Sequence, residues 1–382
     1  MKTKLLSLNK ISSIYLYFSF LLGFSDYQIK TKLTLEGFKR LLKVRDIKLN
    51  KSFGIFIDDI VDNQIKEYFE KELYNILKED ISIMKFIKKE KIIDNRIKLS
   101  FDEIKMIPIS FLLLGERKNI TAFIEDEFSK ENKNKMIKLK KAVYDSGTAT
   151  IPIFRGMGFS KLIINETIKN LKKNKIDGFI LEVLQDNKKA KNLYIDSGFN
   201  ISRKFYCYKI EKEKLEENLE NILNNNKVNL QDIKIKKLGK IYTILALKED
   251  KLIKLSRSIP SWQNSLKSVK NILDQVSILA LYYNKKLIGL GCIEKINGDI
   301  KFLAVSYPQP SEIKNKDSLN FKDLIKYDEF FKTTLLKALL KETFSRKISI
   351  LNVDKSSELS EFLSMVGFDN FVNQYEMYFK IQ

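Results

Sequence analysis

A change of hydrophobic pattern between residues 150 and 171 predicts a strand, a turn and a helix in succession. The β-favouring run Thr150–Ile153 ends at a turn with two glycines, Arg155-Gly156-Met157-Gly158. Apolar residues then recur on one face of a helix, at Leu162, Ile163, Ile164, Ile168 and Leu171. Glycines let a backbone approach a ligand closely, and the first N–H groups of a helix attract an anion. This layout is typical of a phosphate-binding turn.

Periodic segments on both sides of the turn predict further elements. Phe179–Val183 reads as a buried strand, and Thr34 as the N-cap of a helix. The pattern also predicts a strand over Tyr27–Leu33 and another over Ile107–Leu114 before Gly115, with Ile120–Ile124 as a weaker partner strand. It predicts amphipathic helices within 61–92. Lys138–Val143 and the turn Asp145–Thr148 then lead into the strand before the glycine turn. This order of elements predicts the α/β class, with a mixed sheet and helices on both faces.

The chain repeats itself weakly after residue 231. Asp299–Val305 resembles the strand before the glycine turn, Leu351-Asn352-Val353 resembles Leu181-Glu182-Val183, and Gly367-Phe368 resembles Gly198-Phe199. Such internal similarity indicates duplication. We expect an N-terminal apolar extension (1–25), a first domain (26–210), a linker helix (211–230) and a second domain (231–382).

The second copy differs where the glycine turn of the first would lie. No glycine occurs between Gly298 and Gly367, and the place of the turn holds Ser306–Pro310 and a polar insertion to about Lys326. We therefore expect the second domain to have lost cofactor binding and to serve a structural or substrate-shaping role.

The charge of the chain changes this picture little. The 382 residues carry a formal net charge of +21, which could attract nucleic acid or an anionic membrane. Lysine, isoleucine and asparagine are abundant everywhere, however, and no dense Lys/Arg cluster is interleaved with aromatic residues. We do not expect nucleic acid as the main ligand. A nucleic-acid-associated modifier stays an alternative that salt-dependent duplex binding would reveal.

Histidine is absent, which limits the possible chemistry. Ser-His-Asp triads and nearly all catalytic zinc sites are thereby excluded, and we expect no metal. Proton transfer must use carboxylates, Tyr, Lys, Cys or water. The two cysteines, Cys207 and Cys292, lie far apart in the sequence, so we expect a cytoplasmic protein rather than a disulfide. Cys207 lies in an alternating, strand-like run, and we expect its thiol to be buried.

The N-terminus resembles a signal peptide only in part. Lys2, Lys4 and Lys10 precede an apolar stretch over Ile11–Phe24, but serines and tyrosines interrupt it and no small-residue cleavage site follows. An extra helix or a start-site extension fits better than export. The stretch is too short for a confident membrane span, and we expect no membrane association.

Two ordered motifs give the chain a resemblance to the GNAT acyltransferase superfamily. Arg155, Gly158 and Ser160 follow the family's cofactor loop, Arg/Gln-x-x-Gly-x-Gly/Ala, with serine at the last position. A second block follows in family order, Leu181-Glu182-Val183, Asn187-x-x-Ala190, Leu193-Tyr194 and Gly198-Phe199. The resemblance is specific only over residues 140–208. It implies two GNAT-like domains in tandem, each a twisted mixed sheet with helices on both faces.

The resemblance implies acetyl-CoA as co-substrate, and it assigns cofactor-binding residues. Backbone N–H groups of the loop would bind the pyrophosphate, at Arg155, Gly156, Met157, Gly158, Phe159 and Ser160. The backbone of Ala149, Thr150 and Ile151 would pair with the pantetheine arm where two parallel strands splay apart. The Arg155 side chain either binds phosphate or caps the loop. Asn187 either contacts pantetheine or caps a helix, and Ala190 leaves room for the cofactor.

Tyr194 falls where many GNAT enzymes carry a tyrosine that protonates the leaving thiolate, although it could be a packing aromatic. The base that deprotonates the amine could be Asp145, Glu182 or a chain of water molecules. Asp145 could also be an ordinary turn residue. The implied reaction is N-acetylation of a primary amine on a small molecule or peptide.

The main alternative is a non-catalytic CoA-binding or interaction protein, since one copy is already degenerate. Trp262, the single tryptophan, could line an acceptor pocket between the domains or anchor the second core. The sequence does not distinguish these two roles of Trp262.

Overall fold

The computed structural model describes residues 1–26, 33–59, 61–79, 92–93, 96–125, 134–225, 232–306 and 321–381. Two sheets form its framework, and a two-stranded ribbon, β3 (Ile92–Ile93) with β4 (Arg96–Ile97), lies apart from them. Along the larger sheet the strand order is β1 (Thr3–Ser7), β2 (Phe53–Ile57), β5 (Ser110–Glu125), β6 (Asn134–Thr150), β7 (Gly178–Leu184), β14 (Asp369–Lys380), β8 (Asn200–Glu211) and β13 (Lys347–Asp354). The smaller sheet has the order β12 (Ile300–Val305), β11 (Lys286–Glu294), β10 (Val276–Tyr283) and β9 (Ile233–Lys237).

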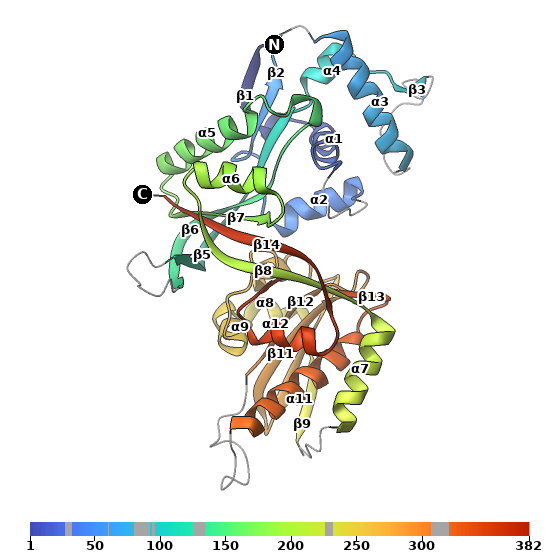
Figure 1. Cartoon of the computed structure of the whole chain (residues 1–382), viewed down its shortest axis with the longest axis vertical. Helices are drawn as coiled ribbons and strands as arrows, with labels where there is room; N and C mark the ends of the chain where they lie inside the picture. The colour runs from blue at the N-terminus through green and yellow to red at the C-terminus, as the bar shows by residue number, and fades with distance from the viewer. Residues whose placement is uncertain are drawn as a thin grey trace.

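We call the elements from β1 to β8 the first half and those from β9 to β14 the second half. In the first half, α1 (Ser13–Gly23) and α2 (Leu35–Val44) lie on one side of the sheet, and α5 (Phe159–Lys173) and α6 (Lys188–Asp196) on the other (Figure 1). The second half repeats this order, with α11 (Phe321–Leu340) before β13 and α12 (Glu358–Met365) before β14. The remaining helices are α3 (Asn63–Glu79), α4 (Phe101–Lys105), α7 (Lys212–Asn225), α8 (Lys240–Leu245), α9 (Glu249–Ser256) and α10 (Leu266–Lys270), with short 3-10 turns at Leu8–Lys10 and Pro152–Phe154.

The two halves exchange strands in the middle of the larger sheet. β14, the last strand of the chain, lies between β7 and β8 and pairs antiparallel with both (Figure 1). β8 in turn pairs with β13 of the second half. Each half therefore contributes a strand that the other half would otherwise lack.

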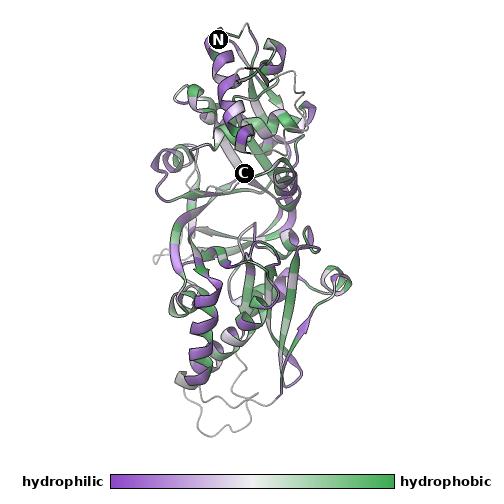
Figure 2. Ribbon diagram, turned by 90° about the vertical axis from the view of Figure 1, so that its right-hand side faces the viewer, coloured by the Kyte–Doolittle hydropathy of each residue, from purple (hydrophilic) through white to green (hydrophobic). Residues whose placement is uncertain are grey.

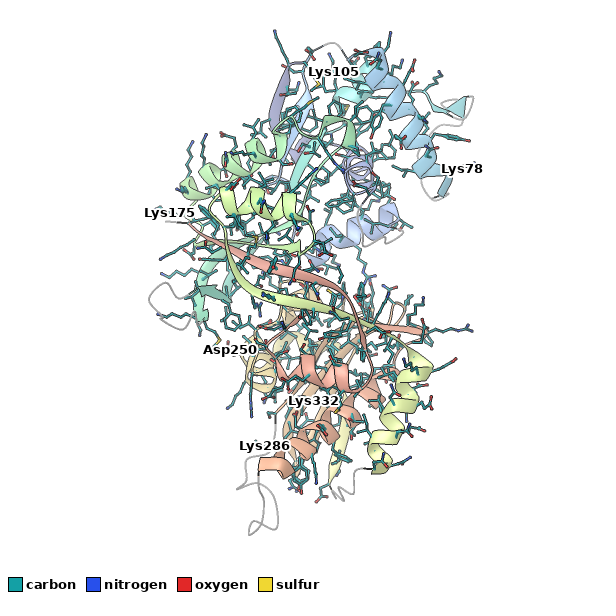
Figure 3. The ribbon with its side chains drawn as sticks, in the orientation of Figure 1. Lys78, Lys105, Lys175, Asp250, Lys286 and Lys332 are labelled. Atoms are coloured by element: carbon teal, nitrogen blue, oxygen red, sulfur yellow. The ribbon has the colours of Figure 1, made fainter. Side chains whose placement is uncertain are left out.

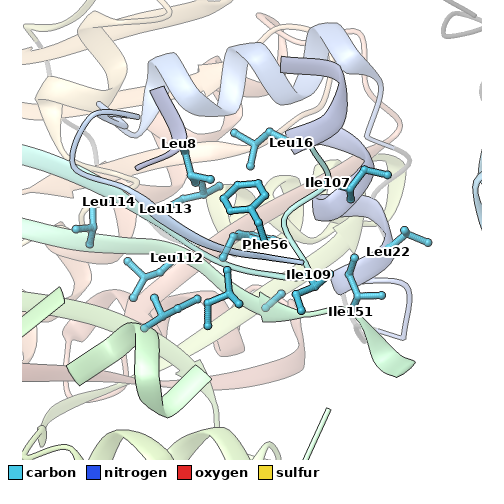
Figure 4. Packing of buried hydrophobic residues seen from close by; sticks show 14 of the residues in the cluster. Leu8, Leu16, Leu22, Phe56, Ile107, Ile109, Leu112, Leu113, Leu114 and Ile151 are labelled. Carbon is cyan, nitrogen blue, oxygen red and sulfur yellow. The ribbon is translucent and has the colours of Figure 1, made fainter. Parts of the chain in front are cut away.

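The largest core cluster packs between α1, β2 and β5. Leu8, Leu16 and Leu22 meet Phe56 and Ile109 there (Figure 4). The same cluster includes Met377 from β14, so the strand exchange also exchanges core residues. Helices on the outside carry alternating hydrophilic and hydrophobic stretches, as amphipathic helices do (Figure 2).

Several charged side chains lie on the exterior of the molecule. Lys78, Lys105 and Lys175 lie at the periphery of the molecule (Figure 3). Among the described residues, no helix is both long and apolar enough to cross a membrane.

Several predicted elements agree with the structure and others do not. Thr34 caps α2 by accepting a hydrogen bond from the N–H of Gly37. α3 lies within 61–92, and part of that range, like residues 27–32 of the predicted strand Tyr27–Leu33, is outside the described residues. Within residues 1–25, β1 pairs with β2 and α1 enters the core.

The predicted hairpin of Ile107–Leu114 with Ile120–Ile124 is wrong. Both segments belong mainly to one strand, β5, whose partner is β6. The strand runs through Gly115, where a side chain would meet the carbonyl oxygen of Arg45 at 2.3 Å. Glycine at this position therefore reflects a close approach rather than a turn. Asp145–Thr148 likewise lies inside β6.

Candidate functional site

A gap opens between β6 and β7, the two parallel neighbours of the larger sheet. Their pairing covers Ala142–Asp145 against Gly178–Leu181 and goes no further, so residues 146–150 have no partner on β7. A bulge marks the start of the gap, because Leu113 pairs with Gly147 and Leu114 with Asp145 while Ser146 is passed over. The strand edges beyond the bulge are where an extended ligand could pair.

Ala149, Thr150 and Ile151, which were predicted to pair with a pantetheine arm, follow this bulge, but they are not equivalent. The N–H of Ile151 donates to the carbonyl oxygen of Ile109, and its own carbonyl accepts from the N–H of Phe154. Both backbone groups of Ile151 are thus used within the chain. Its predicted pairing with a pantetheine arm is therefore corrected.

The glycine turn lies open at the end of the gap. Gly156 and Gly158 have φ angles of +80° and +79°, which only glycine adopts easily, and a side chain at either position would meet no atom within 4 Å. α5 begins directly afterwards at Phe159 with Gly158 as its N-cap. Met157 is exposed in the turn. The turn therefore presents backbone N–H groups to an unobstructed space.

Arg155 turns away from this space. Its Nε donates to the carbonyl oxygen of Thr150 at 3.0 Å, and Nη2 donates to the carbonyl oxygen of Gly23 and to Oδ1 of Asp26. Through this hydrogen bond and its charge, the guanidinium lowers the pKa of Asp26. Of the two roles open from the sequence, the structure has Arg155 capping the loop.

Ser160, at the position where the family has glycine or alanine, uses its hydroxyl in a hydrogen-bonded chain. Its hydroxyl lies 2.9 Å from Oγ1 of Thr150, which lies 2.7 Å from Oγ of Ser110. This chain of hydroxyls ties the first turn of α5 to β6 and β5.

Asn187 is the N-cap of α6. Its Oδ1 accepts a hydrogen bond from the N–H of Ala190 at 3.1 Å, and the residue is exposed. Ala190 is half-buried and packs against the large core cluster. In this structure, the capping role is the one Asn187 has.

Tyr194 and Asp145 form a buried pair on the α6 side of the sheet. The phenol donates to Oδ2 of Asp145 at 3.1 Å, and this oxygen also accepts from Oγ1 of Thr148. The N–H of Gly147 donates to Oδ1. Burial raises the pKa of Asp145, although these hydrogen bonds act in the opposite direction. Asp145 is thus a bulge residue that orients Tyr194.

Glu182 points to the opposite face of the sheet from Leu181 and Val183, as its alternation predicted. Its Oε2 accepts hydrogen bonds from the hydroxyl of Tyr144 at 2.9 Å, Nε2 of Gln263 at 2.7 Å and Nδ2 of Asn352 at 2.7 Å. Its Oε1 is buried and has no hydrogen-bond partner among the described residues. Burial, with the charge of Glu376, raises the pKa of Glu182.

Trp262 packs against the first half rather than the second core. Its ring stacks on Tyr144 at 5.1 Å with an interplanar angle of 10°, and the guanidinium of Arg117 lies 4.3 Å from the ring centre. The segment around it brings Gln263 to Glu182. The sequence pattern pointed to Trp262 and its neighbouring amides as a candidate acceptor pocket, but it assigned no site role to Tyr144 or Asn352.

Cys207 is buried, as expected, and so is Cys292; burial raises the pKa of each thiol. The part of the chain that the structure describes holds no group of His, Cys, Asp and Glu side chains arranged for a metal ion.

No protein-family model matches the chain, and no curated protein matches it. Solved structures do match. A probable N-acyltransferase from Enterococcus faecalis V583 is similar over 100% of this chain and 73% of its own, with 12% identity and a TM-score of 0.50. A GCN5-related N-acetyltransferase from Kribbella flavida is similar over 100% and 72%, with 9% identity and a TM-score of 0.49. A tandem GNAT protein from the clavulanic acid biosynthesis pathway is similar over 70% and 85%, with 10% identity and a TM-score of 0.41.

At this identity the likeness concerns the fold. It extends over the whole chain for the Enterococcus faecalis protein. The chain therefore has a mixed α/β fold of the GNAT type, in which the order of elements is repeated in its two halves.

Proposed function

We propose that the protein is an N-acyltransferase that moves an acetyl group from acetyl-CoA to a primary amine in the gap between β6 and β7. One observation carries the proposal. The gap begins at a bulge flanked by the Tyr194–Asp145 pair on one side of the sheet and by Glu182 on the other, and it ends at an open glycine turn.

The residues of the turn fit the pyrophosphate of a coenzyme A ester. Gly156 and Gly158 leave the approach to the backbone clear, and the first N–H groups of α5 point out of the helix end. Arg155 contributes by holding the turn in this shape, and Ser160 by fixing α5 to the strands. Each charge-assisted hydrogen bond to phosphate would contribute about 1.5–3 kcal/mol before solvation costs.

Proton transfer can be assigned to this chain's own side chains. The amine nitrogen attacks the thioester carbonyl carbon, the C–N bond forms, and the C–S bond breaks when the tetrahedral intermediate collapses. Glu182 takes the amine proton on its unpartnered Oε1, directly or through water. Tyr194 donates the phenol proton to the departing sulfur, and Asp145 positions that phenol.

The acceptor class stays broad, a primary amine of a small molecule or peptide. We also propose that the protein is cytoplasmic, because Cys207 and Cys292 are both free thiols.

Release of free thiol from acetyl-CoA in the presence of a panel of primary amines tests the proposal. Amine-dependent release that Glu182→Gln and Tyr194→Phe both reduce is the expected result. Tight acetyl-CoA binding with no release across the panel would contradict catalysis and favour a non-catalytic CoA-binding protein.

A further inference from the structure

The second half of the chain supplies two of the three donors on Glu182. Gln263 and Asn352 reach Glu182 from positions 81 and 170 residues away. We propose that the second half completes the active site of the first, with Gln263 and Asn352 as positioning residues that occupy Oε2 of Glu182 and leave Oε1 to take the proton of the acceptor amine. This inference rests on the proposed function.

Asn352 is held in place by both its backbone conformation and its side-chain contacts. It lies in a bulge of β13, where the pairing with β8 skips from Ile350 to Val353, and its φ angle of 56° is left-handed. Its Oδ1 accepts from Nε2 of Gln374 at 2.9 Å, so its Nδ2 must face Glu182. Bulges and left-handed residues gather where a side chain is re-aimed for function.

Gln263 is oriented in the same way by a charged partner. Its Oε1 accepts from Nη2 of Arg45 at 2.9 Å, which turns its Nε2 toward Glu182. Nη1 of Arg45 donates to the carbonyl oxygen of Ser146 at 2.7 Å. Gln263 and Arg45 therefore connect Glu182 to the bulge that opens the gap.

The segment that carries Gln263 is anchored to the first half. Arg117 is 2% exposed, and its Nη1 donates to the carbonyl oxygen of Trp262 at 2.8 Å. The same guanidinium donates to the hydroxyls of Ser265 and Ser268 and forms an ion pair with Asp46. The donors from the second half are thus fixed relative to Glu182.

Loss of either donor would disfavour the charged carboxylate, because hydrogen bonds to a charged form stabilise that form. Tyr144 from β6 and Glu376 from β14 also face Glu182, as does the charge of Arg45 after α2. Arg203 and Cys207 from β8 lie close enough to feel its charge. Of these groups, Cys207 also contacts Asn352, whose Oδ1 accepts a hydrogen bond from its thiol at 3.7 Å.

Trp262 provides a readout that needs no acceptor. It is the single tryptophan, and it stacks on Tyr144, whose hydroxyl donates to Glu182. A pH titration of tryptophan fluorescence in the full chain should show a transition that Glu182→Gln removes. Asn352→Gly should move the midpoint to higher pH, since glycine tolerates the left-handed φ but offers no donor. Asn352→Asp should move it further, because it places a second carboxylate there.

Asn284→Gly is the matched control, because Asn284 is also left-handed, with φ 47°, but exposed. Its midpoint should equal that of the unaltered protein. With an amine that turns over, Asn352→Gly should lower kcat, leave KM for acetyl-CoA unchanged and shift the acid limb of the pH–rate profile to higher pH.

Equal midpoints for Asn352→Gly and the unaltered protein would overturn the inference, and so would a titration without any part that depends on Glu182. A failure to bind or turn over acetyl-CoA would instead refute the proposed function. The two failures are therefore distinguishable, because the fluorescence titration requires neither acetyl-CoA nor an acceptor.

Discussion

At the scale of single residues, the two carboxylates of the gap differ in what their oxygens accept. Asp145 has both oxygens engaged by Gly147, Thr148 and Tyr194. Glu182 has one saturated oxygen and one without a described partner. This difference is why we propose positioning for Asp145 and proton transfer for Glu182, a choice that the sequence left open.

Tyr194→Phe removes the phenol that would protonate the thiolate. We expect kcat to fall about 10²-fold, the usual contribution of a general acid, with acetyl-CoA affinity unchanged. Tyr208→Phe is the matched control, since Tyr208 is another buried tyrosine whose hydroxyl contacts a side chain, Ser360. Steady-state kinetics of both variants checks this, and equal activities of the two would remove Tyr194 from the mechanism.

The raised pKa of Glu182 has a consequence for stability. A carboxyl whose pKa is higher in the folded chain than in the unfolded chain, where it is about 4.3, gives a free energy of unfolding that falls as pH rises. Glu182→Gln keeps an oxygen for the three donors and cannot ionise. The free energy of unfolding of this variant should therefore increase relative to that of the unaltered protein as pH rises from about 4.3 through the raised pKa.

Urea unfolding across this pH range measures the difference. The exposed Glu67→Gln serves as the control and should follow the unaltered protein more closely. A Glu182→Gln variant that loses stability relative to the unaltered protein as pH rises would contradict the raised pKa.

At the scale of elements, the sequence predicted those features that depend on interactions between neighbouring residues. The glycine turn before α5, the cap at Thr34 and the strand at Phe179–Val183 follow from neighbouring residues. Contacts distant in sequence account for the errors. Gly115 marks the approach of Arg45, and Asn352 reaches Glu182 across 170 positions, so no local pattern reveals either.

Gly158→Ala tests the turn at this scale. Alanine in a left-handed conformation costs about 1–2 kcal/mol, and we expect that loss of stability together with weaker acetyl-CoA binding. Gly239→Ala is the control, because Gly239 also caps a helix in open space but has φ −71°. Thermal unfolding and calorimetric titration measure both effects, and an unaffected Gly158→Ala variant would make the turn irrelevant to the site.

At the scale of the whole molecule, the strand exchange joins the two halves into one structural unit. β14 brings Met377 into the core of the first half, and β8 brings Tyr208 and Ile210 into a core of the second. Unfolding of either half would therefore remove a strand from the other half and expose its core. The duplication predicted from sequence is visible in the order of elements, whereas the exchange itself has no sequence signal that we recognised.

We expect a single cooperative unfolding transition, with calorimetric and van't Hoff enthalpies that agree. Met377→Ala should lower the free energy of unfolding by about 2–5 kcal/mol, because it leaves a cavity in a fully buried position. Met365→Ala, at a position 46% exposed, should have little effect. Two resolved transitions, with only one of them moved by Met377→Ala, would show that the halves fold independently.

The most direct test of the account is a calorimetric titration of the full chain with acetyl-CoA, with ATP and NAD as comparison ligands. We predict saturable binding of acetyl-CoA at one site, weakened by Gly158→Ala and unchanged by Gly239→Ala, with no comparable binding of ATP or NAD. No binding of acetyl-CoA, or equal binding to the Gly158→Ala variant, would contradict the claim that the gap between β6 and β7 and its glycine turn form an acyl-CoA site.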